Sequence, residues 1–278
     1  MKANYHTHTT WCDGKDSPRA VVESAIAKGF DAIGFSSHSM LPGSYLDWAL
    51  TPEKAPRYAA EIRALAVEFA SKIRVLCGVE ADWLVGEAEP SYAAYDCISP
   101  DYIIGSVHFV RGTDGEIVCV DKSPQSMEEG VRDHFCGDMR AFVVSYFAAV
   151  RESLAFDFDI VGHPDLVRKF NAGSRYFDET ADWYVSELKD TADAIAASGK
   201  VVEVNTGAIS RGWLDDAYPS PSFRAMLRER GVSFLLSADS HAADAIDCAF
   251  DRFAECEDFC APEFARQTPT KSLAASIS

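Results

Sequence analysis

The segment "VSFLLSADSH", residues 232–241, is a short apolar stretch that ends in Asp239 and His241. Its β-branched and aromatic residues are typical of a buried β-strand. Six more segments of this kind occur along the chain, and we therefore expect seven buried strands. The other six lie at 3–8, 32–38, 73–82, 102–110, 159–165 and 201–207.

Helical patterns fill the intervals between these strands. In "DSPRAVVESAIAKGF", Ser17 is placed to cap a helix, Pro18 to occupy its first turn and Gly29 to end it. Apolar residues at helical spacing predict a second helix over 139–155. Repeated alternation of strand and helix predicts a parallel sheet, so we expect an α/β fold, a distorted TIM-like (β/α)7 barrel. The other expected helices lie at 52–72, 178–198, 221–230 and 242–254.

The composition is that of one soluble domain. The chain has 278 residues, of which 47% are hydrophobic, enough to build one large core. We expect a single barrel domain over 1–262. The segment 263–278 lacks apolar periodicity, and we expect it to be a flexible tail.

Charge and cysteine content limit the classes of function. The formal net charge of −17 argues against nucleic acid as the main partner, because a nucleic-acid backbone requires a basic surface. The eight cysteines form no C-x-x-C pair, which favours reduced thiols and a cytoplasmic location. No apolar stretch approaches the roughly 20 residues of a membrane span, and the N-terminus lacks a signal-peptide pattern. We expect no membrane partner.

Six of the seven histidines lie at or beside the predicted carboxyl ends of strands. In a parallel barrel these ends converge on one face, where active sites are built. A lone histidine there would more often be a hydrogen-bonded core residue. So many buried imidazoles and carboxylates would be unfavourable without partners, and metal ions would satisfy them. The residues are His6, His8, His38, His108, His163 and His241, with Glu80 and Asp239.

The motifs around these residues resemble those of the polymerase and histidinol phosphatase (PHP) superfamily. They follow one another in family order from about residue 3 to about residue 254. Two of them, "GHPDLVRKFN" and "NTGAISRG", together with "YPSP" at 218–221, are most similar to the stand-alone histidinol-phosphatases. The motifs are "HTH" at the N-terminus, "SSHS", "CGVEAD", "GSVH", "IVGHPDLVRKFN", "EVNTGAISRG" and "SADSH".

The resemblance implies three divalent metal ions. Imidazole and carboxylate ligands suit Zn, Mn or Fe. Asp13 stands where many relatives have a histidine. The implied groups are His6, His8, Glu80 and Asp239 for one ion, Glu80, His108 and His163 for a second, and Asp13, His38 and His241 for a third.

The resemblance also implies hydrolysis of a phosphate monoester, L-histidinol phosphate, to L-histidinol and inorganic phosphate, a step of histidine biosynthesis. Three divalent ions outweigh three ligand carboxylates, so a phosphate dianion could bind inside an acidic protein. A metal-activated hydroxide would attack phosphorus. Glu80, Asp239 and Asp13 would then be the catalytic carboxylates.

Four residues are candidates for binding the substrate. Arg168 and Arg211 follow the fifth and sixth predicted strands and could clamp the phosphate, although each could equally be a solvated loop residue. Lys169 is a further candidate for this contact. Asn205 could donate to the substrate or, alternatively, cap a loop.

Several other segments could shape the mouth of the barrel. The segment 111–138 contains "TDGE", a hairpin-like turn, and could act as a lid or as a plain surface excursion. The segment 40–51, with Tyr45 and Trp48, is a second lid candidate. An acidic rim would favour an ester that carries a cation. Candidates for such a rim are Asp82, Asp165 and Glu203, of which Glu203 could instead point into the barrel.

Two other classes of function share the same residues. A PHP phosphoesterase acting on another small phosphate ester or a nucleotide phosphodiester would differ only in its rim and loops. A non-catalytic metal-binding domain is disfavoured, because a scaffold does not need an open cluster of metal ions.

Overall fold

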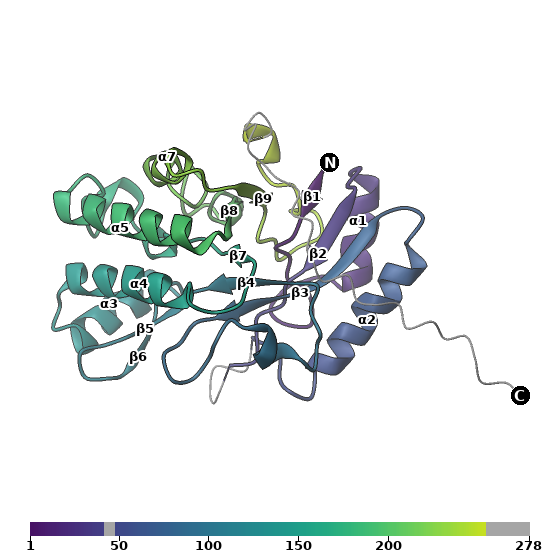
Figure 1. Cartoon of the computed structure of the whole chain (residues 1–278), viewed down its shortest axis with the longest axis horizontal. Coiled ribbons are helices and arrows are strands. Elements are labelled where there is room, and N and C mark those ends of the chain that lie inside the picture. Colours follow the sequence, from purple (N-terminus) through teal and green to yellow (C-terminus); the bar gives the residue numbers. More distant parts are fainter. Residues whose placement is uncertain (42–47, 254–278) are drawn as a thin grey trace, which may run out of the picture.

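The computed structural model describes residues 1–41 and 48–253. A parallel sheet of seven strands runs through the molecule in the order β1-β2-β3-β4-β7-β8-β9 (Figure 1). Each strand lies inside one of the segments expected from the sequence. The strands are β1 Ala3–Asn4, β2 Ala32–Phe35, β3 Arg74–Asp82, β4 Tyr102–Ser106, β7 Ile160–Val161, β8 Val201–Asn205 and β9 Phe234–Ser237.

The sheet closes through the chain that follows its two edge strands. Thr7, after β1, pairs in parallel with Ser240, after β9. His8 N donates to Ser240 O at 2.8 Å, and Ser240 N donates to His6 O at 3.2 Å. The predicted distorted (β/α)7 barrel is therefore confirmed, and the distortion lies mainly in β1 and β7, which have 2 residues each.

Helices cover the outside of the barrel, with α1 and α2 beside β1–β3 and α4, α5 and α7 beside the remaining strands (Figure 1). The predicted start of α1 is confirmed, since Ser17 accepts from Ala20 N and Pro18 opens the helix. None of the helices within the described ranges has the length and apolar character of a membrane span. The helices are α1 Pro18–Ala27, α2 Ala55–Glu68, α3 Pro124–His134, α4 Met139–Ser153, α5 Asp182–Ser198, α6 Gly207–Ser210 and α7 Pro221–Glu229.

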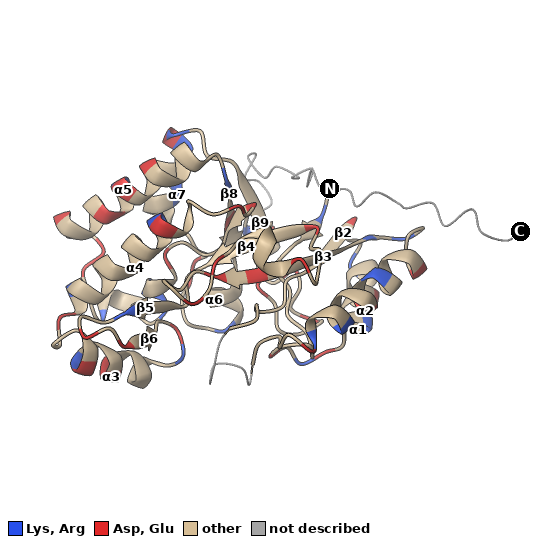
Figure 2. Ribbon diagram, turned by 60° about the horizontal axis from the view of Figure 1, so that its bottom comes forward, with Lys and Arg blue, Asp and Glu red and all other residues tan. Residues whose placement is uncertain are grey.

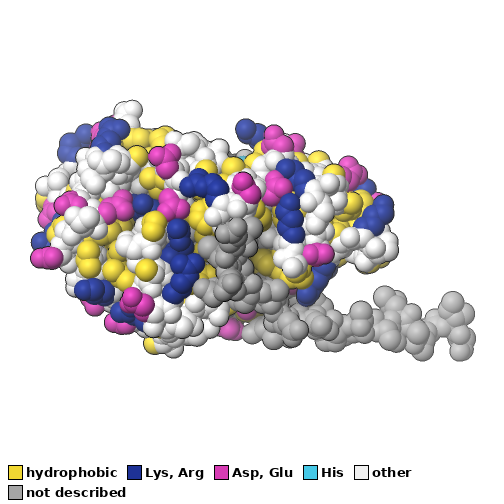
Figure 3. Space-filling model, turned by 90° about the horizontal axis from the view of Figure 1, so that it is seen from above, with side chains coloured by type: hydrophobic (Ala, Val, Ile, Leu, Met, Phe, Trp, Pro, Cys, Tyr) yellow, Lys and Arg dark blue, Asp and Glu magenta, His cyan; other side chains and the backbone are white. Residues whose placement is uncertain are grey.

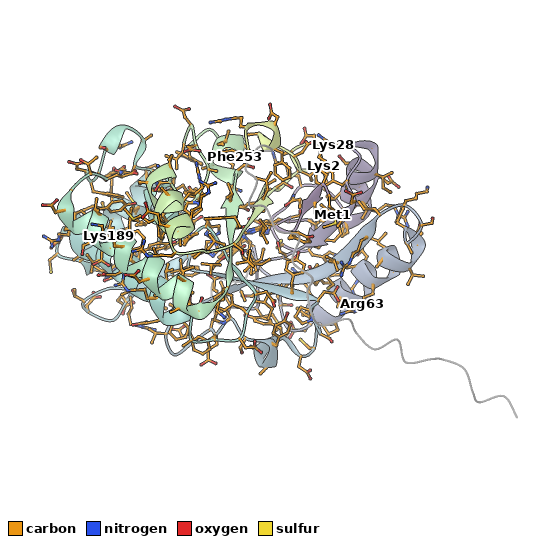
Figure 4. The ribbon with its side chains drawn as sticks, turned by 45° about the horizontal axis from the view of Figure 1, so that its top comes forward. Met1, Lys2, Lys28, Arg63, Lys189 and Phe253 are labelled. Carbon is orange, nitrogen blue, oxygen red and sulfur yellow. The ribbon has the colours of Figure 1, made fainter. Side chains whose placement is uncertain are left out.

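The prediction of a helix at 242–254 is wrong for residues 242–253, the part of the segment that the structure describes. This segment forms turns and one short 3₁₀ turn, Phe250–Arg252, because its polar groups bond to other elements. Asp247 accepts from Lys28 Nζ at 2.6 Å and from Lys2 Nζ at 3.0 Å, and the two lysines lie close together in Figure 4. Backbone groups of the segment also bond outside it, since Ala243 N donates to Asp16 Oδ2 at 2.8 Å and Ile246 O accepts from Asn4 Nδ2 at 3.2 Å.

An antiparallel hairpin follows β4. Its strands are β5 Phe109–Arg111 and β6 Ile117–Cys119, joined through the "TDGE" turn with Gly115 at a φ of +91°. The predicted hairpin is confirmed, and α3 follows it. Within 40–51, residues 42–47 lie outside the described residues, and so does the expected tail at 263–278.

Tyr102 fills the centre of the barrel. Its side chain is fully buried, and its hydroxyl donates to the backbone carbonyls of Tyr5 and Phe35. A Cβ atom added to Gly34 or Gly78 would overlap the Tyr102 phenol ring. Glycine is therefore required at both positions because the ring needs the space of the missing side chains.

We expect Gly78→Ala to lower the free energy of unfolding by about 1–3 kcal/mol, because overpacking a filled core forces neighbours to move. The urea midpoint, followed by circular dichroism, measures this change. Val67→Ala, at a side chain that is 80% exposed, is the control and is expected to change little. A Gly78→Ala midpoint equal to that of the control would contradict the role assigned to Tyr102.

Charged residues of both signs share the outer surface. In Figure 2, acidic and basic residues both occur on the outer helices, and acidic residues also lie at the middle of the barrel. On the face seen in Figure 3, Lys and Arg side chains lie among Asp and Glu side chains. The net charge of −17 describes the whole chain, and the local charge differs from one part of the surface to another.

Candidate metal centre

The structure brings all the predicted metal ligands to the carboxyl ends of the strands. Each follows a strand or, for Glu80, lies near the end of β3. Four groups of these side chains have ligand atoms within 4.8 Å of one another and could hold metal ions. The groups are His6, His8 and Glu80; His6, His163 and Asp239; His38, Glu80 and His108; and His8, Asp13, His38 and His241.

Glu80 lies between two pairs of histidines. Its Oε2 atom is 3.3 Å from His6 Nε2 and 3.5 Å from His8 Nε2. Its Oε1 atom is 2.9 Å from His163 Nε2 and 3.5 Å from His108 Nε2. The Oε2 atom is also 2.9 Å from His38 Nδ1. Because the two oxygens face different sets of imidazoles, this carboxylate has the geometry of a bridge between metal positions.

Asp239 adds a second carboxylate on the side of His6 and His8. Its Oδ1 atom is 3.3 Å from His8 Nε2 and 3.7 Å from His6 Nε2. With Glu80 Oε2, these atoms form the first group expected from the sequence. The carboxylate is fixed from its other side, where Arg211 Nη2 donates to Asp239 Oδ2 at 2.6 Å.

Asp13 lies on the open side of the cluster, and its side chain is 34% exposed. Its Oδ2 atom is 3.2 Å from His241 Nε2, and its Oδ1 atom is 3.7 Å from His38 Nε2. His8 Nδ1 is 3.8 Å from Asp13 Oδ1, so His8 faces this third group as well as the first. A carboxylate at position 13 therefore reaches the two histidines with which it was predicted to act.

Several ligand atoms are buried without hydrogen bonds. Among the described residues, His6 Nε2, His8 Nε2 and Glu80 Oε2 have no partner of suitable geometry. Unpaired polar atoms in a protein interior are unfavourable by a few kcal/mol each, about 1–3 by mutational measures. A divalent cation would satisfy all three at once, so the residues present fit a metal site.

Burial and neighbouring charges together set the pKa values of the histidines and carboxylates in the cluster. Burial lowers the pKa of His8 to about 3, with help from the nearby His241 and His38 imidazoles, which favours a neutral imidazole. Burial acts to raise the pKa of Glu80, but His6 and His108 outweigh it and hold that pKa well below its usual range. Burial acts to lower the pKa of His6 and of His108, but Glu203 beside His6 and Asp82 beside His108 outweigh it and raise both, that of His108 to about 10. Metals bind the neutral imidazole and the ionised carboxylate, so a metal ion at these two histidines would take the place of a proton.

Two buried carboxylates stand behind the histidines. Glu203 Oε2 is 2.9 Å from His6 Nδ1, and Asp82 Oδ1 is 2.8 Å from His108 Nδ1. Glu203 points into the barrel, which is the second of the two alternatives that the sequence left open. The expected acidic rim is wrong, because Asp82, Asp165 and Glu203 are all fully buried.

An open cavity of about 870 Å³ lies over the cluster. Outside the ligand groups, the lining of this cavity is basic rather than acidic. Four cationic side chains lie there with one carboxylate, that of Asp121. One wall is apolar and includes Trp48 and Phe109, whose ring centroids are 6.2 Å apart. The cationic residues are Lys15, Lys122, Lys169 and Arg211.

Two of the predicted substrate-binding residues line this cavity. Besides its contact with Asp239, Arg211 lies with Nη1 3.1 Å from His241 Nδ1. Lys169 Nζ donates to Asp121 O at 2.8 Å and to Asp121 Oδ2 at 2.9 Å. Both cations are therefore held at the edge of the ligand cluster by acceptors on neighbouring loops.

Arg168 and Asn205 do not line the cavity. Arg168 is 8% exposed, and its Nε atom donates to Glu179 Oε2 at 3.1 Å, because the 3₁₀ turn Leu166–Arg168 directs it inward. Asn205 is fully buried, and its Nδ2 atom donates to Glu203 Oε1 at 2.8 Å. The structure therefore brings neither of these two predicted substrate-binding residues into the lining of the cavity.

The sequence interpretation missed three residues of the site, Lys15, Asp121 and Lys122. It named Asp82 only as a rim candidate, although the two-residue spacing from Glu80 in one strand places both on one face. Lys15, Asp121 and Lys122 lie in loops, where no periodicity indicates direction. Their place beside the cavity follows from the fold of the hairpin segment and of the loop after β1.

A seven-stranded barrel that carries groups of histidines and carboxylates at the carboxyl ends of its strands is the arrangement of a metal-dependent hydrolase of the α/β-barrel class. The PHP domain family matches residues 4–207, and the chain belongs to this family. The curated relatives include the "Probable histidinol-phosphatase" of Deinococcus radiodurans, 30% identical over 85% of each chain. Histidinol-phosphatase of Bacillus subtilis is 26% identical over 92% of this chain and 99% of the relative.

Solved structures share the fold. A crystal structure from Listeria monocytogenes has a TM-score of 0.80 at 20% identity and covers 91% of this chain and 100% of that one. Histidinol phosphate phosphatase from Lactococcus lactis, complexed with zinc, L-histidinol and phosphate, has a TM-score of 0.62 at 24% identity, with 87% of each chain covered. These likenesses support the distorted (β/α)7 barrel.

Proposed function

We propose that this protein hydrolyses L-histidinol phosphate to L-histidinol and inorganic phosphate, a step of histidine biosynthesis. The observation that carries the proposal is Glu80, whose two oxygens each face a pair of histidines beneath an open cavity. Membership of the PHP domain family and relatives named histidinol-phosphatase support the substrate.

The residues present would hold three divalent ions, of zinc, manganese or iron. Such ions supply Lewis acidity and lower the pKa of water toward neutrality. The carboxylates of Glu80, Asp239 and Asp13 take the catalytic role of holding these ions around one reacting phosphate. The proposed groups follow the resemblance and the contacts described above: His6, His8, Glu80 and Asp239; Glu80, His108 and His163; and Asp13, His38 and His241.

Two cations of this chain would bind the phosphate oxygens. Arg211 has its guanidinium against Asp239, so it can donate to a phosphate while it stays bonded to the carboxylate. Lys169 also lines the cavity, and its ammonium group donates to Asp121. Charge-assisted hydrogen bonds from these groups would orient the ester over the ligand cluster.

The hairpin segment would shape the side of the cavity that receives the rest of the substrate. Ile117, Cys119, Asp121 and Lys122 all line the cavity and come from within 111–138. Together with Trp48, they offer an apolar wall for an imidazole ring and one carboxylate for an amine. We infer that this segment selects the substrate.

A second candidate is a phosphate ester with another anionic group, such as a nucleotide. Lys15 and Lys122 line the cavity and favour such a ligand, since their charge is not needed for a cationic alcohol. The direct test is phosphate release from L-histidinol phosphate beside sugar phosphates, nucleotides and an aryl phosphodiester, after separate loading with Mn, Zn and Fe. We expect a preference for histidinol phosphate; a preference for nucleotides would replace the substrate and keep the metal site.

We expect Lys169→Ala to raise KM for the ester roughly tenfold or more, since a hydrogen bond from a charged group contributes about 1.5–3 kcal/mol. Arg168→Ala, at the adjacent position, is the matched control and is expected to keep KM, because its Nε atom serves Glu179. Steady-state kinetics of both variants decide the matter. A rise of KM in Arg168→Ala alone would reverse the assignment.

A further inference from the structure

Two histidines on opposite sides of Glu80 are each held by a buried carboxylate. His6 Nε2 faces Glu80 Oε2 at 3.3 Å, and His108 Nε2 faces Glu80 Oε1 at 3.5 Å. Behind them, Glu203 accepts from His6 Nδ1 at 2.9 Å, and Asp82 accepts from His108 Nδ1 at 2.8 Å. Both carboxylates are fully buried, and neither lines the cavity.

The direction of these hydrogen bonds fixes the form of each imidazole. An ionised carboxylate only accepts hydrogen bonds, so the ring hydrogen must lie on Nδ1 of His6 and of His108. In the neutral form of each ring, which is the form that binds a metal ion, the lone pair then lies on Nε2, the atom that faces Glu80. A metal ion binds that lone pair, so the carboxylates hold both rings in the binding tautomer.

Glu203 also ties neighbouring strands to the cluster. Its Oε1 atom accepts from His163 N at 2.9 Å and from Asn205 Nδ2 at 2.8 Å. Its Oε2 atom accepts from Ser237 Oγ. The donors come from or beside β7, β8 and β9, so this carboxylate sets the position of His163 as well as of His6.

The buried charge of Glu203 has its partner on the His6 side. Among the described residues, no Lys or Arg forms an ion pair with Glu203, and the group that does is the His6 ring. A buried negative charge without a positive partner is strongly unfavourable. A metal ion on the far side of the His6 ring would offset it, and the same argument applies to Asp82 through His108.

We propose that Glu203 and Asp82 are positioning residues for two different metal positions. Glu203 acts through His6 on the group that contains His8 and Asp239, and Asp82 acts through His108 on the group that contains His163. Loss of either carboxylate weakens metal binding on one side of Glu80. This inference rests on the metal-dependent function proposed above, because it assigns roles within the same site.

The test uses Glu203→Gln and Asp82→Asn in the full chain. Zn²⁺ binding is measured by competition with a chromophoric chelator, and metal content is measured after gel filtration. We expect each variant to bind one equivalent of Zn²⁺ roughly 10- to 100-fold more weakly than the unaltered protein, with the others unchanged. Asp159→Asn is the matched control, since this carboxylate accepts from Ile103 N and Tyr92 Oη at the opposite end of the strands.

A second readout separates positioning from plain stability. We expect the rise in thermal midpoint on Zn²⁺ addition to shrink in Glu203→Gln and Asp82→Asn but not in Asp159→Asn. Equal shifts and equal Zn²⁺ affinity in all the proteins would overturn the proposal. If a variant does not fold, ¹⁵N spectra of the unaltered zinc-loaded protein still decide, because a ring hydrogen on Nε2 of His6 and His108 would also overturn it.

The same set of measurements keeps the two proposals apart. Weaker Zn²⁺ binding in both variants, with no histidinol phosphate hydrolysis by the unaltered protein, would reject the substrate and keep the positioning role. Hydrolysis of histidinol phosphate by the unaltered protein, with Zn²⁺ affinity unaffected in both variants, would keep the substrate and reject the positioning role.

Discussion

Glu80→Gln is expected to lose metal and phosphatase activity together. The carboxylate has one oxygen toward His6 and His8 and the other toward His108 and His163. An amide has only one acceptor oxygen, and its NH₂ group would face one imidazole pair with hydrogens. Metal-based stabilisation of a transition state contributes several kcal/mol, so we expect kcat/KM to fall roughly a thousandfold or more.

Metal content by mass spectrometry and kcat/KM on the same sample measure this effect. The control is Glu129→Gln on α3. The exposed Glu129 carboxylate accepts from Gln125 Nε2 and belongs to none of the ligand groups. Circular dichroism of both variants reports folding. Full metal content and an unchanged rate in Glu80→Gln would exclude the bridging role.

Removal of metal from the unaltered protein is expected to lower its thermal midpoint by roughly 10 °C. Ions present at about a thousandfold above their dissociation constant stabilise the folded state by about 4 kcal/mol, and each kcal/mol shifts the midpoint of a chain this size by about 2–4 °C. The structural reason is the set of buried atoms without hydrogen bonds, His6 Nε2, His8 Nε2 and Glu80 Oε2.

Differential scanning calorimetry with and without chelator measures this shift, and activity should disappear in the same samples. Re-addition of Zn, Mn or Fe should restore both properties. Chelator applied to Glu80→Gln serves as the control and should change its midpoint much less, because that variant has already lost bound metal. If the unaltered protein had the same thermal midpoint with and without chelator, metal ions would not stabilise its folded state.

The strands could be predicted because each is a buried β-branched stretch that ends in polar residues. The segment 242–254 misled the prediction because its spacing of alanines and Ile246 is compatible with a helix. Its backbone is held instead by partners from elsewhere: Ser24 Oγ donates to Ala243 O, and Asn4 Nδ2 donates to Ile246 O. Local spacing does not reveal such distant donors.

The gathering of the candidate metal ligands could be predicted because the carboxyl ends of parallel strands must meet. Substrate-facing residues could not, because one position along a tight turn reverses the direction of a side chain. Arg168 and Lys169 are adjacent, yet Arg168 turns inward to Glu179 while Lys169 lines the cavity. The prediction of an acidic rim failed for a different reason: Glu203 lies within β8, and its side chain is on the inner face of the strand, toward His6.

The closure of the barrel between Thr7 and Ser240 has a consequence for the order of folding. His6 and His8 leave the ribosome long before Asp239 and His241, which are among the last residues of the barrel to emerge. The two edges are joined across nearly the whole domain, and contacts so distant in sequence form late. Nascent chains that end before residue 239 should therefore be unable to retain metal in the first group, and metal capture would mark the completion of the barrel.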